Sequence, residues 1–259
     1  MRVIQFDDQG RLRAAKVESP EQVVPIDVEG GVLGLARIAI DQGASLESVI
    51  EARLEDTTLD YQALVDQGRL LPPVTHPDPA HCLVTGTGLT HLGSADTRSA
   101  MHAKIEGASE AELTDSMRMF KLGVEGGKPG EGKIGAQPEW FYKGNGTTLR
   151  GPGGVVDLPA YALDGGEEPE LVGCYIVDPD GVPRRLGFAL GIEWSDHETE
   201  TINYLYLAPS KLRTCAVGPE LITDWEFSDI DLQCTVRRDG EEIYESGPLK
   251  SGEEYMCHS

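Results

Sequence analysis

The stretch that decides the fold is EEPELVGCYIVDPDGVPRRLGFALGIEWSDH, residues 167–197. Two strand-like runs flank Asp178-Pro179-Asp180-Gly181, a combination of residues that is typical of a tight hairpin turn. Similar turn signals occur at Asn145-Gly146 and at Asp239-Gly240, again between strand-like runs. The pattern predicts that the larger part of the chain is mostly β and that a hairpin forms at each of these three turns.

Acidic residues in this stretch predict a cation site. Glu168 and Glu170 are two residues apart, so in a strand their carboxylates point to the same face while Pro169 faces away. Two anions this close repel, and a cation between them is expected. Glu193, reached through the tight turn, adds a third acid and completes an oxygen-rich pocket for Mg²⁺ or Mn²⁺. On so acidic a chain, the spacing by itself favours an exposed acidic strand instead.

The N-terminal part of the chain has a different pattern. Residues 3–17 alternate apolar and polar around Asp8-Gln9-Gly10, which predicts an opening hairpin. Two helices follow: one is capped by Ser45, with Leu46, Val49, Ile50 and Leu54 on one face, and a shorter one is ended by Gly68. The proline-dense residues 70–81 predict a linker. We therefore expect a small α+β domain over residues 1–75 and a β-rich domain over residues 76–259.

One helix is predicted within the β-rich domain. Ser109 and Glu112 form a capping box that opens residues 109–123, and a glycine-rich segment, residues 123–135, follows. That segment is not a phosphate-binding loop, because Pro129 follows Lys128 where Ser or Thr is required and because the helix precedes the loop. A surface loop is favoured over a mobile lid.

Composition excludes several function classes. The chain has 259 residues, with 44 acids against 22 bases and a formal charge of -22. This charge argues against a nucleic acid or an anionic membrane as a partner. The longest apolar stretch, residues 32–40, is too short to span a bilayer, and residues 1–16 carry charges in place of a secretory signal. Five scattered cysteines without a CxxC pair favour reduced thiols in a cytoplasmic protein.

Several blocks in order resemble the fumarylacetoacetate hydrolase superfamily, and most closely its arabinose-type 2-keto-3-deoxy sugar-acid dehydratase branch. The blocks are VTGTGLTHLGSA (84–95), QPEWFYKGNGTTL (137–149), EEPELVG (167–173), GFALGIEWSDH (187–197) and SKLRTCAVGPELI (210–222). The resemblance covers roughly residues 70–259. It implies a mixed β-roll catalytic domain behind a small N-terminal domain, and a homodimer.

The resemblance also implies site residues. The ligands of a divalent metal would be Glu168, Glu170 and Glu193. His91 would be the catalytic base, and Lys143 and Lys211 would contact the substrate and take part in catalysis. The substrate would be a small 2-oxo acid, and the metal Mg²⁺ or Mn²⁺.

The chain departs from the family pattern in three places. Many relatives have a glutamate three residues after the histidine, where this chain has Ser94, so the usual His-Glu dyad is in doubt. Common members have Asp where this chain has Glu193. The family also continues past Ser259 with a strand that lines the pocket, so we expect this chain to be truncated at its C-terminus.

Three functions remain open at this point. The first is dehydration of a 2-keto-3-deoxy sugar acid through a metal-stabilised enolate. The second is hydrolysis of a carbon-carbon bond in a 2,4-diketo acid, which would use the same residues. The third is a non-catalytic protein that binds 2-oxo acids, for which Ser94 is the motivating residue.

Individual residues also have simpler interpretations. His91 could hydrogen-bond to a loop backbone, and Lys143 could be an ordinary surface lysine. Lys211 precedes an expected buried strand, which favours a functional role. For His197, an exposed turn residue is favoured over a group that supports a metal ligand. The remaining histidines are expected to be structural, namely His76, His81, His102 and His258.

Overall fold

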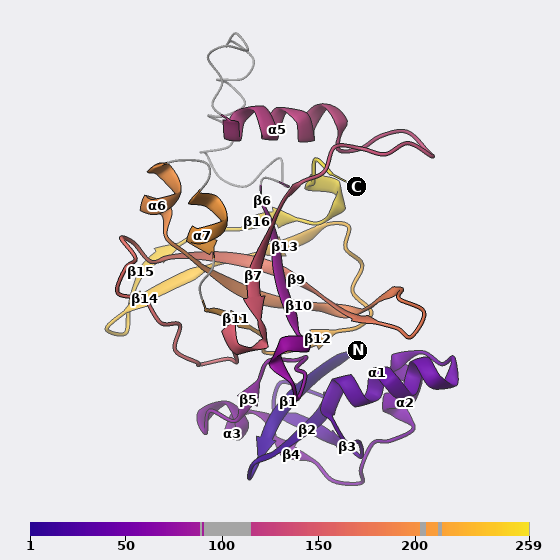
Figure 1. Cartoon of the computed structure of the whole chain (residues 1–259). Helices are drawn as coiled ribbons and strands as arrows, with labels where there is room; N and C mark the ends of the chain where they lie inside the picture. The colour runs from indigo at the N-terminus through magenta and orange to yellow at the C-terminus, as the bar shows by residue number, and fades with distance from the viewer. Residues whose placement is uncertain (89, 91–114, 203–205, 212–213, 259) are drawn as a thin grey trace. The chain divides into compact units, whose positions relative to one another are not determined.

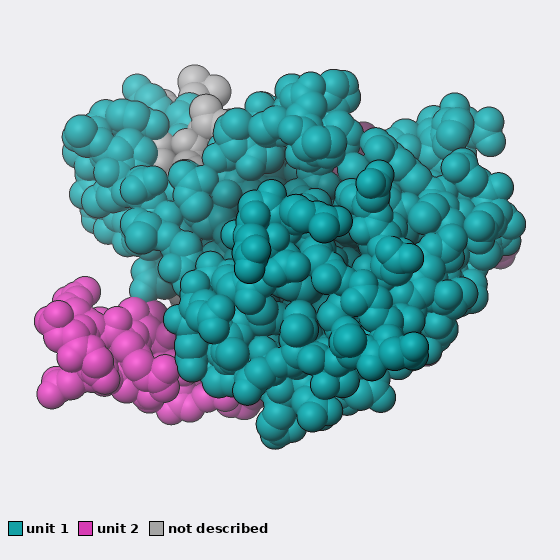
Figure 2. All heavy atoms as spheres, turned by 90° about the horizontal axis from the view of Figure 1, so that it is seen from below, with its two compact units in different colours: residues 1–84, 142–225 teal, residues 85–141, 226–259 magenta. Residues whose placement is uncertain are grey.

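A computed structural model describes residues 1–88, 90, 115–202, 206–211 and 214–258 of the chain (Figure 1). His91, Ser94 and the predicted capping box at Ser109 lie outside the described residues. The chain forms two compact units, one of Met1–Val84 with Tyr142–Trp225 and the other of Thr85–Phe141 with Glu226–Ser259 (Figure 2). The domain boundary predicted near residue 75 stays a prediction, because a compact unit need not be a domain that folds independently.

The first unit is built on one large sheet. Among the described residues this sheet has ten strands, with the order β4-β3-β2-β1-β12-β10-β11-β8, while β5 pairs with β1 and β9 with β10. Its strands are β1 (Arg2–Asp8), β2 (Arg11–Val17), β3 (Gln22–Ile26), β4 (Leu59–Asp60), β5 (Leu70–Leu71), β8 (Leu149–Arg150), β9 (Gly166–Val177), β10 (Pro183–Ser195), β11 (Cys215–Val217) and β12 (Leu221–Ile222). Its helices are α1 (Gly31–Gln42), α2 (Leu46–Glu51), α3 (Tyr61–Asp66), α6 (His197–Ile202) and α7 (Leu207–Lys211), with short 3-10 turns at η1 (Pro79–His81) and η3 (Gly146–Thr148).

Helices cover both faces of β1–β3, and the alternation of side chains along the strands explains why. Val3 of β1 packs with α1 and α2, whereas Ile4 and Phe6 pack with α3 on the opposite face. Gln5 points to the same face as Val3 and is completely buried. Its amide nitrogen donates to the Pro72 carbonyl at 2.7 Å, and its Oε1 accepts from the Val32 backbone N–H at 2.8 Å. One buried side chain therefore satisfies a free N–H at the start of α1 and fixes the proline-rich segment.

Most N-terminal predictions are confirmed. The hairpin turns at Gln9-Gly10, where both residues have positive φ, and Ser45 caps α2 by accepting from the Ser48 N–H. Gly68 follows α3 with φ +63°. One detail is wrong: α2 ends at Glu51, so Leu54 lies beyond it and bridges to Ile26 instead.

Helix α1 was not predicted. Its N-cap is Gly30, whose backbone is left-handed, and no side chain caps the helix. Gly34 interrupts the apolar run from within. The segment has no Ser, Thr, Asp or Asn at the N-cap position, so it lacks the sequence signal that indicates the start of a helix. Among the described residues, no helix is both long and apolar enough to cross a membrane.

Two of the three predicted hairpins in the β-rich part are confirmed. The turns at Asp178–Gly181 and Asp239-Gly240 join β9 to β10 and β14 (Thr235–Arg238) to β15 (Glu241–Glu245). The hairpin predicted at Asn145-Gly146 is wrong. The Asn145 side chain accepts from the Thr147 N–H at 3.0 Å and caps η3, so the chain turns away and β8 pairs with β11.

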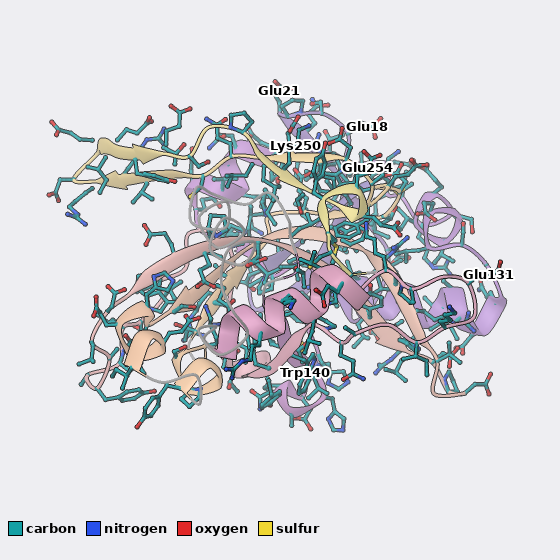
Figure 3. All side chains as sticks on the ribbon, turned by 90° about the horizontal axis from the view of Figure 1, so that it is seen from above. Glu18, Glu21, Glu131, Trp140, Lys250 and Glu254 are labelled. Atoms are coloured by element: carbon teal, nitrogen blue, oxygen red, sulfur yellow. The ribbon has the colours of Figure 1, made fainter. Side chains whose placement is uncertain are left out.

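The second unit contains α5 (Asp115–Gly126), β13 (Ile230–Leu232), β14, β15, β16 (Leu249–Ser251) and η5 (Glu253–Tyr255). The chain passes between the units along a ribbon of β6 (Leu83–Gly88) and β7 (Glu139–Asn145). On β16, Lys250 pairs with Asp229 at 3.0 Å and Asp231 at 2.8 Å, and Glu254 follows in η5 (Figure 3). The predicted helix over residues 109–123 is confirmed from Asp115 onward, but it continues to Gly126, so the first residues of the predicted glycine-rich loop are helical.

Candidate metal centre

Three carboxylates converge at one end of the β9–β10 hairpin. Figure 1 labels the two strands of this hairpin. Glu168 lies directly opposite Glu193 in the antiparallel ladder, and Glu170 lies opposite Gly191. The three glutamates each place a carboxylate oxygen within 4.8 Å of those of the other two. The structure thus brings together the three residues that the sequence singled out, and their role as metal ligands stays a prediction.

The turn that produces this register is held by its own first residue. Asp178 Oδ1 accepts from the backbone N–H of Asp180 at 3.0 Å and of Val182 at 2.8 Å, and Oδ2 pairs with Arg184 at 2.8 Å. These backbone N–H groups and Arg184 keep the pKa of Asp178 below its ordinary value. Because a slip of one residue would send Glu193 to the opposite face, the turn also determines the site.

Lys143 is a buried cation beside this cluster. Only 3% of the residue is exposed. Its ammonium lies 3.2 Å from Glu193 Oε1 and donates to the backbone carbonyls of Trp194 at 3.1 Å and Lys211 at 2.7 Å. Burial excludes the simpler interpretation of Lys143 as a surface lysine. Its predicted contact with a substrate stays a prediction.

Lys211, the last residue of α7, provides a second buried cation. Its ammonium forms a short ion pair with Glu168 Oε1 and lies 3.4 Å from Glu200 Oε2. The expected strand after it is present as β11. Lys211 therefore contacts both a predicted metal ligand and a carboxylate for which no role was predicted.

Helix α6 brings two more groups to Glu168. His197 Nε2 lies 2.8 Å from Glu168 Oε1, although about half of the histidine side chain is exposed. The contact with Glu168 agrees with the interpretation of His197 as a group that supports a metal ligand. Its exposure agrees with the favoured interpretation as an exposed residue, although His197 begins α6 and does not lie in a turn. Glu168, His197 and Glu200 form a second set of oxygen and nitrogen atoms within 4.8 Å of one another.

Asp196 explains why α6 begins at His197. The side chain of this fully buried residue accepts from the Thr199 N–H at 2.9 Å and from the Thr199 hydroxyl at 2.7 Å. It also accepts from the Leu163 N–H at 2.9 Å, and its own N–H donates to the Ser210 carbonyl at 3.3 Å. No role was predicted for Asp196 or Glu200. The pair Asp196 and Thr199 has the spacing of a helix cap, which was the available signal.

Burial and charge act in opposite directions on these groups. Burial, with help from nearby Glu168, raises the pKa of Glu193 to about 7, although Lys143 and Lys211 oppose the rise. Burial also works against the charge on Glu168, yet Lys211 and then His197 hold the pKa of this carboxyl below its ordinary value. For Lys211, burial is outweighed by Glu168 and then by Glu200 and Glu193, so the pKa of the ammonium is raised. One carboxyl of the facing pair thus holds a proton near neutral pH while the other is ionised.

The donor set suits a hard divalent cation. All three converging groups are carboxylates, which Mg²⁺ and Mn²⁺ prefer over sulfur or imidazole. Glu193 Oε1 is buried and makes no well-formed hydrogen bond with any described residue, although the Lys143 ammonium is 3.2 Å away. A buried carboxylate oxygen in this state is costly, and a bound cation would satisfy it.

The sequence matches no known family model and no curated protein sequence. Solved structures do match. A 2-keto-3-deoxy-D-arabinonate dehydratase complexed with magnesium and 2,5-dioxopentanoate aligns with 100% of this chain and 79% of its own, at 18% identity and a TM-score of 0.65. The chain has the fold of this dehydratase.

Two further structures agree. A hexagonal crystal form of 2-keto-3-deoxyarabinonate dehydratase aligns with 96% of this chain and 77% of its own, at 19% identity and a TM-score of 0.65. A 2-hydroxyhepta-2,4-diene-1,7-dioate isomerase from Mycobacterium marinum covers 100% of this chain and 77% of its own, at 15% identity and a TM-score of 0.55. The predicted α+β, mostly β fold is therefore confirmed, and it is the fold of the 2-keto-3-deoxyarabinonate dehydratase structures.

Proposed function

We propose that the chain is a divalent-metal-dependent enzyme that dehydrates a 2-keto-3-deoxy sugar acid. The observation that carries the proposal is the convergence of Glu168, Glu170 and Glu193 within 4.8 Å. The fold adds support, because one protein that shares it is a dehydratase of this substrate class solved with magnesium. Glu168, Glu170 and Glu193 would hold Mg²⁺ or Mn²⁺.

A bound divalent ion would chelate the carboxylate and keto oxygens of a 2-oxo acid, acidify its C3 protons and stabilise the resulting negative charge. His91, which lies outside the described residues, would take the C3 proton as the base. The ammonium of Lys211 lies beside Glu168 and would stabilise the enolate oxygen electrostatically. The C4 hydroxyl would then leave as water with the proton that His91 removed, which leaves a C3–C4 double bond. A proton shift from C5 to C3, followed by tautomerisation of the C4–C5 enol, would give the 2-oxo semialdehyde.

A second candidate is an isomerase that moves a proton on an unsaturated oxo acid. The observation that favours it is the shared fold with the Mycobacterium marinum isomerase. Both reactions begin with removal of a proton next to a carbonyl, so the same acids and lysines would serve. The candidates differ in whether water is lost.

Product analysis tests the proposal. The full chain with Mg²⁺ is incubated with 2-keto-3-deoxypentonates, and a 2-oxo semialdehyde is expected. An unsaturated 2-oxo diacid and a 2,4-diketo acid are assayed in parallel. Turnover of only the unsaturated 2-oxo diacid would favour the isomerase. Turnover of only the 2,4-diketo acid would favour a carbon-carbon hydrolase. Thermal stabilisation by all three without any product would indicate a protein that only binds 2-oxo acids.

A further inference from the structure

Lys211 makes two ion pairs that place it between two carboxylates. Its ammonium contacts Glu168 Oε1 and lies 3.4 Å from Glu200 Oε2. The side chain is 7% exposed, that of Glu168 is 25% exposed and that of Glu200 is 34% exposed. A buried ammonium therefore has one acceptor inside the predicted metal site and one outside it.

Both ends of this arrangement are fixed by the backbone. The Lys211 carbonyl accepts from the buried Lys143 ammonium at 2.7 Å, which holds the end of α7. The Glu200 N–H donates to the Asp196 carbonyl at 3.1 Å. Asp196 is fully buried, and its own N–H donates to the carbonyl of Ser210, the residue before Lys211. The side chain of Lys211 is flexible, so its ammonium can shift between Glu168 and Glu200 while the backbone stays in place.

A divalent cation bound to Glu168 would compete with the Lys211 ammonium for this carboxylate. A metal ion and an ammonium that share one carboxylate oxygen repel each other strongly in a poorly solvated site. Either the ammonium leaves Glu168 or the metal binds more weakly. Glu200 offers the ammonium an acceptor that it already contacts, so the move requires no new partner.

The charges support the same conclusion. The three predicted ligands and Glu200 together carry four negative charges when all are ionised. Lys143 and Lys211 carry two positive charges. One divalent cation makes the whole group neutral. Without Glu200 the loaded site would keep one excess positive charge in a largely buried location, which is unfavourable.

We infer that Glu200 is a positioning residue that takes the Lys211 ammonium from Glu168 when a divalent cation binds, so that Glu168 is released to the metal and Lys211 stays beside it. The inference rests on the proposed metal site. It assigns a role to a residue that is not itself a ligand of that metal, and it makes Lys211 the internal cation that the metal replaces.

The test measures Mn²⁺ binding to the full chain by calorimetry and by the electron paramagnetic resonance signal of free Mn²⁺. Glu200→Gln keeps the size of the side chain but removes its charge, and we expect the dissociation constant to rise about fivefold to tenfold, a shift of the size found for coupled charged neighbours. Glu198→Gln, a matched change at an exposed position of the same helix, is expected to change it less than about twofold.

The decisive comparison is made in a Lys211→Met background. With the competing ammonium removed, Glu200→Gln is expected to change Mn²⁺ affinity less than about twofold, because the effect of Glu200 acts through Lys211. An effect that persists in full in this background would overturn the inference. So would equal affinities for the Glu200→Gln and Glu198→Gln variants.

Stoichiometry gives a further criterion. One Mn²⁺ per chain is expected, both before and after Glu200→Gln. Two ions per chain, with one lost on Glu200→Gln, would make Glu200 a direct ligand and overturn the inference. Absence of Mn²⁺ binding by the unaltered chain would overturn both the inference and the proposed function, whereas normal binding without an effect at Glu200 overturns the inference alone.

Discussion

Glu168 and Glu193 are direct partners across the β9–β10 ladder. Like charges in opposite positions of an antiparallel pair destabilise it. The protein offsets this cost in two ways: Lys143 and Lys211 lie against the pair as buried cations, and Glu193 holds a proton near neutral pH. A hairpin that served stability alone would not need so many charges. The arrangement supports the proposed cation site.

Replacing both Glu168 and Glu170 by Gln is expected to weaken Mn²⁺ binding by more than about a hundredfold, because two of three carboxylate ligands lose their charge. The matched control is Glu167→Gln, which removes the charge of an exposed neighbour that points to the other face of the strand. Calorimetry measures both. Unchanged affinity in the double variant would show that the metal centre lies elsewhere.

The acidic part of the site could be predicted because it depends on local geometry. A strand period of two and one tight turn suffice to bring Glu168, Glu170 and Glu193 together. The partners of these acids come from distant elements: Lys143 from β7, Lys211 from α7 and Glu200 from α6. Their contacts depend on how those elements pack, and no short-range pattern contains that information.

Metal binding is expected to strengthen as pH rises toward 7. Burial raises the pKa of Glu193 from 4.5 to about 7, so between these values the folded protein holds a proton that the unfolded chain has released. The unfolded state binds fewer protons there, and the stability of the metal-free protein falls as pH rises through this interval. A cation favours the ionised form and must displace that proton.

The measurement is Mn²⁺ affinity at pH 5.5, 6.5 and 7.5, together with the proton released on binding. Affinity should rise across this range and level off above about pH 7, where Glu193 is already ionised. Glu193→Gln should bind more weakly and lose most of the slope. A flat profile in the unaltered chain would contradict the prediction.

Asp196→Ala is expected to destabilise the protein by about 2 kcal/mol, the upper range for a lost helix cap, since the side chain also holds the Leu163 N–H. Urea unfolding measures the change. Asp196→Asn keeps one acceptor oxygen and should recover part of the loss, while Glu198→Ala on the exposed face of the same helix should stay within about 0.5 kcal/mol of the unaltered chain. Equal effects of Asp196→Ala and Glu198→Ala would contradict the role of Asp196 as the cap.

The turns show where short-range signals fail. Asp239-Gly240 forms its hairpin with both residues at positive φ, as the sequence predicts. Asn145-Gly146 has the same type of sequence, yet Asn145 has φ -118° and caps a 3-10 turn. Asn can either enter the left-handed region or cap a helical turn, and here the pairing of β8 with β11 selects the second. Long-range strand pairing therefore overrides the local preference.

Above about pH 7, where Glu193 is ionised, Lys143→Met is expected to destabilise the metal-free protein by about 3 kcal/mol, because it leaves this buried carboxylate without its cation and removes two hydrogen bonds to backbone carbonyls. The control is Lys133→Met at an exposed position, which should change stability by less than about 0.5 kcal/mol. Urea unfolding of the metal-free protein measures both. Adding Glu193→Gln to Lys143→Met should recover part of the loss, because a neutral amide no longer requires a counterion. If Lys143→Met were as stable as Lys133→Met, Lys143 would not be a cation on which the site depends.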